Sequence, residues 1–138
     1  MVRHSNNQPW LEQVREEALE PDLPICDPHH HLWESRPKAV QPHYALAEIL
    51  DDISGGHHIV STVFIECGAE FRTEGPEAFR CVGETEYVSA IADEAATGKH
   101  GPCEVAAGIV GTCDLKIGDQ AADVLDAQVE TGKGRFKG

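Results

Sequence analysis

A regular alternation of strand-like and helix-like segments constrains the fold of this chain more than any other feature. Three apolar runs have the composition of buried parallel strands, at residues 24–28, 58–66 and 104–111. Three further segments carry apolar side chains at helical spacing, at residues 46–53, at residues 84–97 and from Asp119 onward. In the last of these, Ala122, Leu125 and Val129 are predicted to face inward. The alternation predicts a parallel sheet with right-handed crossover helices.

The spacing of the three strands is compatible with a barrel. Their centres lie about 40 residues apart on average, so eight such units need on the order of 320 residues, within the range of TIM barrels. The fold prediction is therefore α/β, as an incomplete TIM (β/α)8 barrel with about the first three βα units. A small doubly wound domain is the alternative, although no Gly-x-Gly-x-x-Gly follows the first strand.

The predicted domain limits follow from this pattern. Residues 1–23 are expected to form an amino-terminal extension with a helix over residues 9–21, where apolar side chains recur at four-residue spacing. Residues 24–138 are expected to form the amino-terminal part of the barrel, with a fourth strand beginning at residues 135–138. Three strands cannot close a barrel, and their exposed edges favour assembly with another chain, so a homo-oligomer is expected.

Charge and hydropathy exclude several classes of partner. The net charge is −13 with only 11 Lys plus Arg, which argues against binding to nucleic acid or to an anionic membrane. The longest apolar run, residues 59–65, is short and is interrupted by Ser61 and Thr62, so no transmembrane helix is predicted. The amino terminus lacks the apolar core of a signal peptide. A cytoplasmic protein that acts on a small molecule is the expectation.

The five cysteines do not form a recognisable framework. Their number is odd and no pair is spaced Cys-x-x-Cys, so neither a zinc ribbon nor a disulfide scaffold is supported. Cys26, Cys67 and Cys103 flank predicted strands and are interpreted as small buried hydrophobes. A nucleophilic cysteine is the alternative, but nothing in the sequence marks one thiol for activation.

Three consecutive histidines follow the first predicted strand, in Asp-Pro-His-His-His-Leu-Trp at residues 27–33. Alternate side chains of a strand share a face, so Asp27, His29 and His31 are predicted to point one way and His30 the other. Two imidazoles beside a carboxylate suit a borderline metal ion such as zinc. The alternative is a polar loop that happens to contain histidines, because two ligands do not close a metal site.

Residues 27–33 resemble the first-strand motif of the amidohydrolase-related family of TIM-barrel hydrolases, lactonases and decarboxylases. The resemblance continues through five further segments, at residues 63–68, 75–78, 82–84, 106–111 and 134–138. Family members are much longer, so this chain resembles an amino-terminal fragment. The remaining metal ligands and the catalytic groups are then expected on later strands.

The resemblance implies that His29 and His31 are metal ligands, with zinc as the expected ion. In the metal-independent lactonases of the family, the equivalent histidines position substrate and water. The implied reaction is hydrolysis of an ester, lactone or amide bond in a small, carboxylated substrate by metal-activated water. A decarboxylase of the same superfamily is the alternative, and a non-catalytic, histidine-rich metal-binding fragment is another.

Other polar residues complete the predicted site. Asp27 is a candidate acceptor that orients a metal-binding histidine without touching the metal, or it caps the turn before Pro28. Trp33 either lines the pocket or packs against the loop. Glu66, at the end of the second strand, either contacts substrate and transfers a proton or is simply solvated. Arg72, in a long loop, is a candidate partner for a substrate carboxylate.

Four more residues are weaker candidates for the site. Arg80 and Arg135 are weaker candidates than Arg72 for the same carboxylate. His57 and His58 precede the second strand and so are expected at the opposite end of the sheet, away from the ligands.

Overall fold

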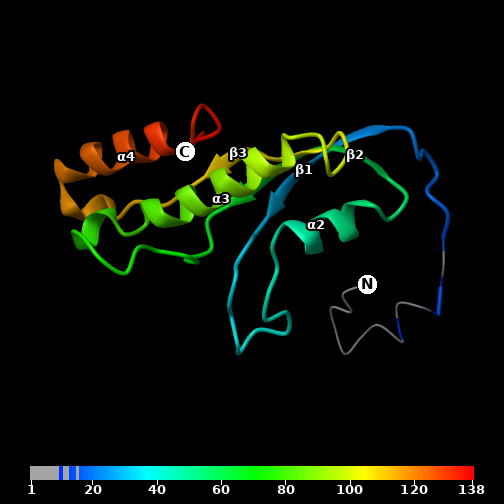
Figure 1. Ribbon diagram of the computed structural model, residues 1–138, viewed down its shortest axis with the longest axis horizontal. Helices are drawn as coiled ribbons and strands as arrows, with labels where there is room; N and C mark the ends of the chain where they lie inside the picture. The colour runs from blue at the N-terminus through cyan, green and yellow to red at the C-terminus, as the bar shows by residue number, and fades with distance from the viewer. Residues whose placement is uncertain (1–9, 11–12, 15) are drawn as a thin grey trace.

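The computed structural model describes residue 10, residues 13–14 and residues 16–138, and it contains one parallel sheet. The strands pair in the order β1-β2-β3, with bounds β1 Pro24–His30, β2 His58–Ile65 and β3 Glu104–Val110. The helices are α2 Leu46–Ile53, α3 Val82–Ala95 and α4 Gln120–Thr131, with 3-10 turns η1 Glu77–Phe79 and η2 Leu115–Ile117. Figure 1 shows α4 alongside α3. Within this described part of the chain, no helix is both long and apolar enough to cross a membrane.

The predicted alternation of strands and helices is confirmed. Each strand and the helices α2 and α3 lie within about three residues of their predicted positions at both ends, and α4 begins one residue after Asp119. The predicted beginning of a fourth strand is also present, because Phe136 forms a parallel bridge with Ile109. The Ile109 amide donates to the Arg135 carbonyl at 2.8 Å, and the Lys137 amide donates to the Ile109 carbonyl at 2.8 Å.

The predicted TIM barrel is wrong, although the α/β class is compatible with the structure. The described residues form a small, open, three-stranded sheet with three helices, and β1 and β3 do not pair with each other. Alternation of strands and helices specifies parallel neighbours, whereas closure depends on strand number and stagger. The doubly wound alternative is not favoured either, since the sequential strand order contains no switch point.

The predicted amino-terminal helix falls partly outside the described residues, at positions 9, 11, 12 and 15. Of the described residues in this range, Trp10 is helical, whereas residues 13, 14 and 16–18 are not. Trp10 and Val14, which belong to the apolar pattern there, are 70% and 67% exposed. Apolar spacing stabilises a short helix only when its apolar face packs against another element.

The main core lies between one face of the sheet and helices α2 and α3. Thr62 and Phe64 on β2 are fully buried on that face, whereas Val63 and Ile65 on the other face are only half-buried. Helix α2 contributes Ile49 to this core, and helix α3 contributes a row of side chains at helical spacing, Val88, Ala92 and Ala95. The second face of the sheet therefore remains partly open in this structure.

Helix α4 is rotated relative to the sequence prediction. Its buried residues are Ala121, Val124 and Gln128. Ala122 is exposed, and Leu125 and Val129 are 37% and 56% exposed, so all three residues predicted to face inward lie outward. Gln128 is buried because its side chain bonds to the Thr85 hydroxyl and to the Thr112 carbonyl. A polar residue with satisfied hydrogen bonds therefore sets the inward face of α4, and hydrophobic spacing alone does not reveal it.

Gly83 allows the loop after β2 to lie directly on helix α3. A Cβ atom at this position would lie 2.6 Å from the Arg72 nitrogen and 2.7 Å from the Glu70 oxygen, both of the main chain. We therefore expect Gly83→Ala to lower the free energy of unfolding by about 2 kcal/mol through overpacking, as measured by urea denaturation.

The matched control for this prediction is Ala90→Ser, which also adds a single heavy atom to helix α3. Ala90 is exposed, so the added hydroxyl meets solvent and not a packed segment. Its expected cost is at most about 0.5 kcal/mol, from the lower helix propensity of serine. Equal stability of the two variants would contradict the close approach at Gly83.

Candidate functional site

His29 and His31 form a close pair at the carboxyl end of β1. Their Nε2 atoms are 3.2 Å apart, and the rings meet nearly at right angles, with 4.9 Å between centroids. His30 is buried and contacts the Phe64 ring on the helix-covered face. The prediction that His29 and His31 share a face while His30 turns away is therefore confirmed.

The ring of His31 is held in one orientation by the end of the neighbouring strand. Its Nδ1 atom lies 2.8 Å from the Ile65 carbonyl oxygen. A carbonyl only accepts hydrogen bonds, so in the neutral imidazole Nδ1 carries the proton and Nε2 has the lone pair. A backbone carbonyl commonly orients a metal-binding histidine in this way. His31 therefore presents a fixed electron-pair donor toward His29.

The separation of the pair fits two ligands of one ion. Two imidazole nitrogens on a tetrahedral zinc, each about 2.0–2.1 Å from the metal, lie about 3.3 Å apart. A direct hydrogen bond from His29 Nε2 to His31 Nε2 gives the same spacing. Across the residues that the structure describes, no group of three His, Cys, Asp or Glu side chains converges as a metal site. The pair thus supplies two imidazole ligands of a metal site, and the described residues supply no third ligand.

Asp27 acts on the backbone of the motif. Its Oδ1 atom accepts a hydrogen bond from the His29 main-chain nitrogen at 3.1 Å, inside β1 at the register irregularity between Asp27 and His30. This contact does not show the predicted alternative, in which Asp27 caps a turn before Pro28. Asp27 therefore holds His29 through its main chain, and its predicted role on an imidazole ring remains a prediction.

Trp33 packs within the loop that follows β1. Its indole nitrogen donates to the Gln41 carbonyl at 3.0 Å, and the Arg36 guanidinium lies 5.0 Å from the ring centroid. The ring also contacts Tyr44, whose backbone pairs with that of Trp33. These contacts hold the end of the loop, just before α2, against its beginning. The structure thus displays the packing role of Trp33, and its substrate role remains a prediction.

Glu66 and Arg72, the other predicted substrate contacts, do not come together with the histidines through any contact in the structure. Glu66 is exposed directly after β2, and its main-chain nitrogen donates to the Val110 carbonyl at 2.8 Å. The Arg72 guanidinium binds both carboxylate oxygens of Glu86. This pairing lowers the pKa of Glu86 below its usual range. The Arg72 side chain is therefore engaged by a carboxylate of its own chain.

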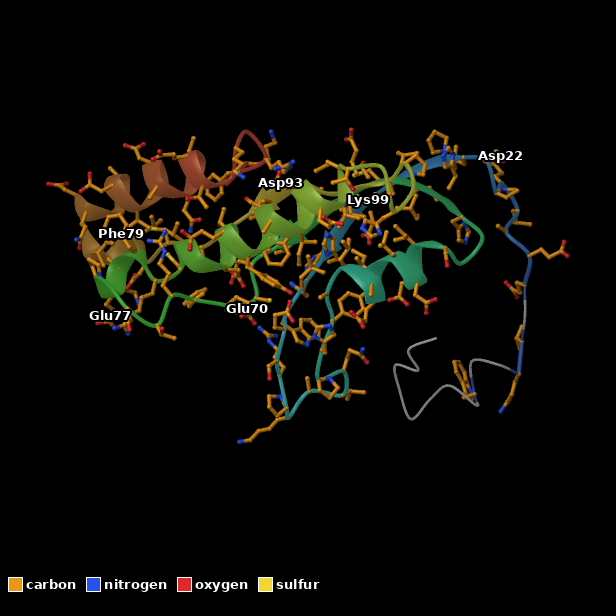
Figure 2. The ribbon with its side chains drawn as sticks, in the orientation of Figure 1. Asp22, Glu70, Glu77, Phe79, Asp93 and Lys99 are labelled. Atoms are coloured by element: carbon orange, nitrogen blue, oxygen red, sulfur yellow. The ribbon has the colours of Figure 1, made fainter. Side chains whose placement is uncertain are left out.

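The loops after the strands lie at one end of the sheet. In Figure 2, Glu70, Glu77 and Phe79 mark the segment that follows β2, whereas Asp22 and Lys99 mark the segments that precede β1 and β3. The first residue of β2 is His58, so His57 and His58 lie at the opposite end from the His29–His31 pair, as predicted.

His30 belongs to a hydrogen-bond chain across the sheet that sequence analysis missed. Its Nε2 atom lies 2.9 Å from the Thr62 hydroxyl, which accepts a hydrogen bond from the Ala106 amide at 2.9 Å. Burial lowers the pKa of His30 to about 4, and the nearby Asp27 carboxylate only partly opposes this effect. Among the described buried side-chain atoms, His30 Nδ1 and Glu84 Oε2 lack a hydrogen-bond partner. His30 is thus a buried neutral imidazole directly behind the exposed pair.

Glu84 is the second residue that sequence analysis did not identify. It is only 1% exposed, at the start of α3, and its Oε1 atom accepts from the main-chain nitrogens of Cys67 at 3.1 Å and Ala69 at 2.7 Å. The carboxylate thereby ties the segment after β2 to helix α3. Burial, together with Glu84, raises the pKa of the Cys67 thiol to about 11, which disfavours a nucleophilic thiolate there.

Known proteins add no identification of this chain. Comparisons with protein-family models, with curated proteins and with solved structures each found no match.

Proposed function

We propose that the His29–His31 pair binds a divalent metal ion, with zinc as the expected ion, in a hydrolase that acts on a small molecule. The observation that carries this proposal is the 3.2 Å separation of the two Nε2 atoms. The Ile65 carbonyl supports it by directing the His31 lone pair toward His29. The resemblance of residues 27–33 to amidohydrolase-related proteins supports the same chemistry.

The reaction proposed is cleavage of an ester, lactone or amide bond in a small, carboxylated substrate. A zinc ion held by the two histidines would lower the pKa of a bound water to about 7 and polarise the substrate carbonyl. Within the chain, Ile65 fixes the His31 ring, and Asp27 fixes the backbone of His29. Glu66, exposed at the adjoining strand end, is the proposed proton-transfer group. A decarboxylase would use the same pair.

A second candidate is a metal-binding module without turnover. It is favoured by the two-ligand character of the site, because no third His, Cys, Asp or Glu joins the pair within the described part of the chain. A catalytic zinc usually has about three protein ligands and an open position. Metal binding is common to the two candidates, and only turnover distinguishes them.

We expect His31→Ala to weaken zinc binding at least tenfold, because it removes one of two ligands that share an ion. Isothermal titration with zinc measures this loss directly. His57→Ala removes an exposed histidine at the opposite end of the sheet and is the matched control, with an expected change below about twofold. Equal zinc affinity of His31→Ala and the wild-type protein would overturn the proposed site.

Turnover of activated esters and of simple lactones, with and without zinc, then separates the two candidates. The hydrolase is supported by zinc-dependent turnover that His31→Ala removes and His57→Ala retains. Zinc binding without turnover of either substrate class supports the module.

A further inference from the structure

A pocket opens between the segment that follows β2 and the segment that follows β3. It has a volume of about 670 Å³, and two cysteines line it, Cys81 and Cys113. Its walls are otherwise mixed, with the apolar side chains of Phe71 and Ile117 and the cation of Arg80. Neither His29 nor His31 is part of this lining, so the pocket is separate from the proposed histidine site.

The structure holds the two cysteines in one neighbourhood. Cys81 is 8% exposed, directly before helix α3, and belongs to the hydrophobic cluster that joins α3 to α4. Cys113 is half-buried and packs against the same cluster. The side-chain nitrogen of Gln128 lies 3.7 Å from Cys81 Sγ and 3.1 Å from the carbonyl of Thr112, the residue before Cys113. One buried amide therefore contacts the first thiol and the peptide bond that leads to the second.

The Cys81 thiol is protected from ordinary nucleophilic chemistry. Burial, and to a lesser degree the nearby Cys113 thiol, raises the pKa of Cys81 above its usual range. The Cys81 sulfur also lies 3.5 Å from the Ala78 carbonyl, to which the thiol donates. Such a thiol reacts slowly with oxidants and alkylating agents at neutral pH, because the thiolate is the reactive form. A bound metal ion changes this, since it displaces the thiol proton outright.

We propose that Cys81 and Cys113 form a dithiol site that binds one soft, monovalent metal ion of the copper(I) class. Soft thiolate ligands select such ions over the hard cations. Two sulfurs suffice for an ion that accepts two ligands, which agrees with the lack of a third metal-binding side chain in the described residues. The largely apolar cluster behind the sulfurs disfavours strongly hydrated cations such as magnesium.

The binding step balances without an oxidant. Two S–H bonds break, two sulfur–metal bonds form, both protons leave to solvent, and neither sulfur nor metal changes its oxidation state. The resulting unit of two thiolates and one monovalent cation carries a single negative charge. Arg80 lies in the pocket wall and partly offsets this charge, whereas Glu77 and Asp114 in the same wall oppose it. Binding is therefore expected to weaken as pH falls, because protons compete with the metal for both sulfurs.

The test is a competitive titration of the whole chain with copper(I), under anaerobic and reducing conditions, against a coloured copper(I) chelator. One ion is expected to bind per chain, and Cys113→Ser is expected to weaken binding at least tenfold. Cys26→Ser is the matched control, because Cys26 is exposed on β1 outside this pocket, contrary to its interpretation from sequence as a buried residue. The copper(I) affinity of this variant is expected to stay within about twofold of the wild-type value. The double variant His29→Ala/His31→Ala is also expected to retain the site, which separates this proposal from the proposed zinc pair.

A second measurement needs no substitution. Iodoacetamide labelling of the wild-type protein, read by peptide mass spectrometry, should show that copper(I) protects Cys113, the more accessible of the two thiols, while the exposed Cys26 remains reactive. Unchanged copper affinity in Cys113→Ser, or an equal loss in Cys26→Ser, would overturn the proposal. Labelling of Cys113 that copper does not affect would overturn it as well.

Discussion

Replacing Glu84 by alanine is expected to lower the free energy of unfolding by about 4 kcal/mol. The carboxylate is buried, and one of its oxygens accepts hydrogen bonds from the main-chain nitrogens of Cys67 and Ala69. Alanine leaves both N–H groups without their acceptor, and each loss costs about 1–3 kcal/mol. It also leaves a cavity at the start of α3. Urea denaturation of the purified variant measures the change.

Two further variants separate the hydrogen bonds of Glu84 from its charge. Glu84→Gln keeps an oxygen that can accept from both amides, so its expected cost is below about 1.5 kcal/mol. Glu86→Ala removes an exposed carboxylate of the same helix that pairs with Arg72, and exposed pairs contribute about 0–1 kcal/mol. If Glu84→Ala is no less stable than Glu86→Ala, the carboxylate does not tie the loop to the helix.

Acidification from pH 7 to pH 4 is expected to remove about 3 kcal/mol of stability through His30 alone. Burial lowers the pKa of His30 from 6.5 to about 4 in the folded protein, whereas the unfolded chain has an ordinary histidine. Between these two pH values the unfolded state binds a proton that the folded state does not bind. The contribution is therefore fully present above about pH 6.5, declines as the pH falls toward 4 and changes little below it.

His30→Gln isolates this contribution, because glutamine does not titrate and its amide can still form a hydrogen bond with the Thr62 hydroxyl, as donor or as acceptor. The measurement is the difference in unfolding free energy between wild type and variant, at several pH values from 4 to 7.5. That difference should shift by about 3 kcal/mol in favour of the variant as the pH falls. The ionisable side chains of Asp27, His29 and His31 act on His30 and are present in both proteins, so the subtraction removes most of their effect. A difference that does not vary with pH would contradict a buried neutral His30.

Local features of the site were predictable from sequence, whereas contacts between residues of different segments were not. The two-residue period of a strand placed His29 and His31 together and His30 apart, because the direction of a side chain follows from its own backbone. The pairing of Arg72 with Glu86 joins residues 14 positions apart across a loop, and no local period indicates it. The role of Glu84 is hidden for the same reason, since its partners are main-chain amides of another segment.

The sequence by itself determined the order of the elements and the sides on which strand residues lie. These follow from apolar periodicity and from helix-stopping residues such as Ser54, which act over a few neighbours. Only the tertiary structure decided that the sheet is open, that α4 turns Gln128 inward and that Cys81 and Cys113 line one pocket. Each of these depends on the free energy of interactions between segments far apart in the chain. The interactions are pairing of strand edges, hydrogen bonds to a buried amide, and packing of one helix on another. Such energies arise only when the elements meet, so no local pattern encodes them.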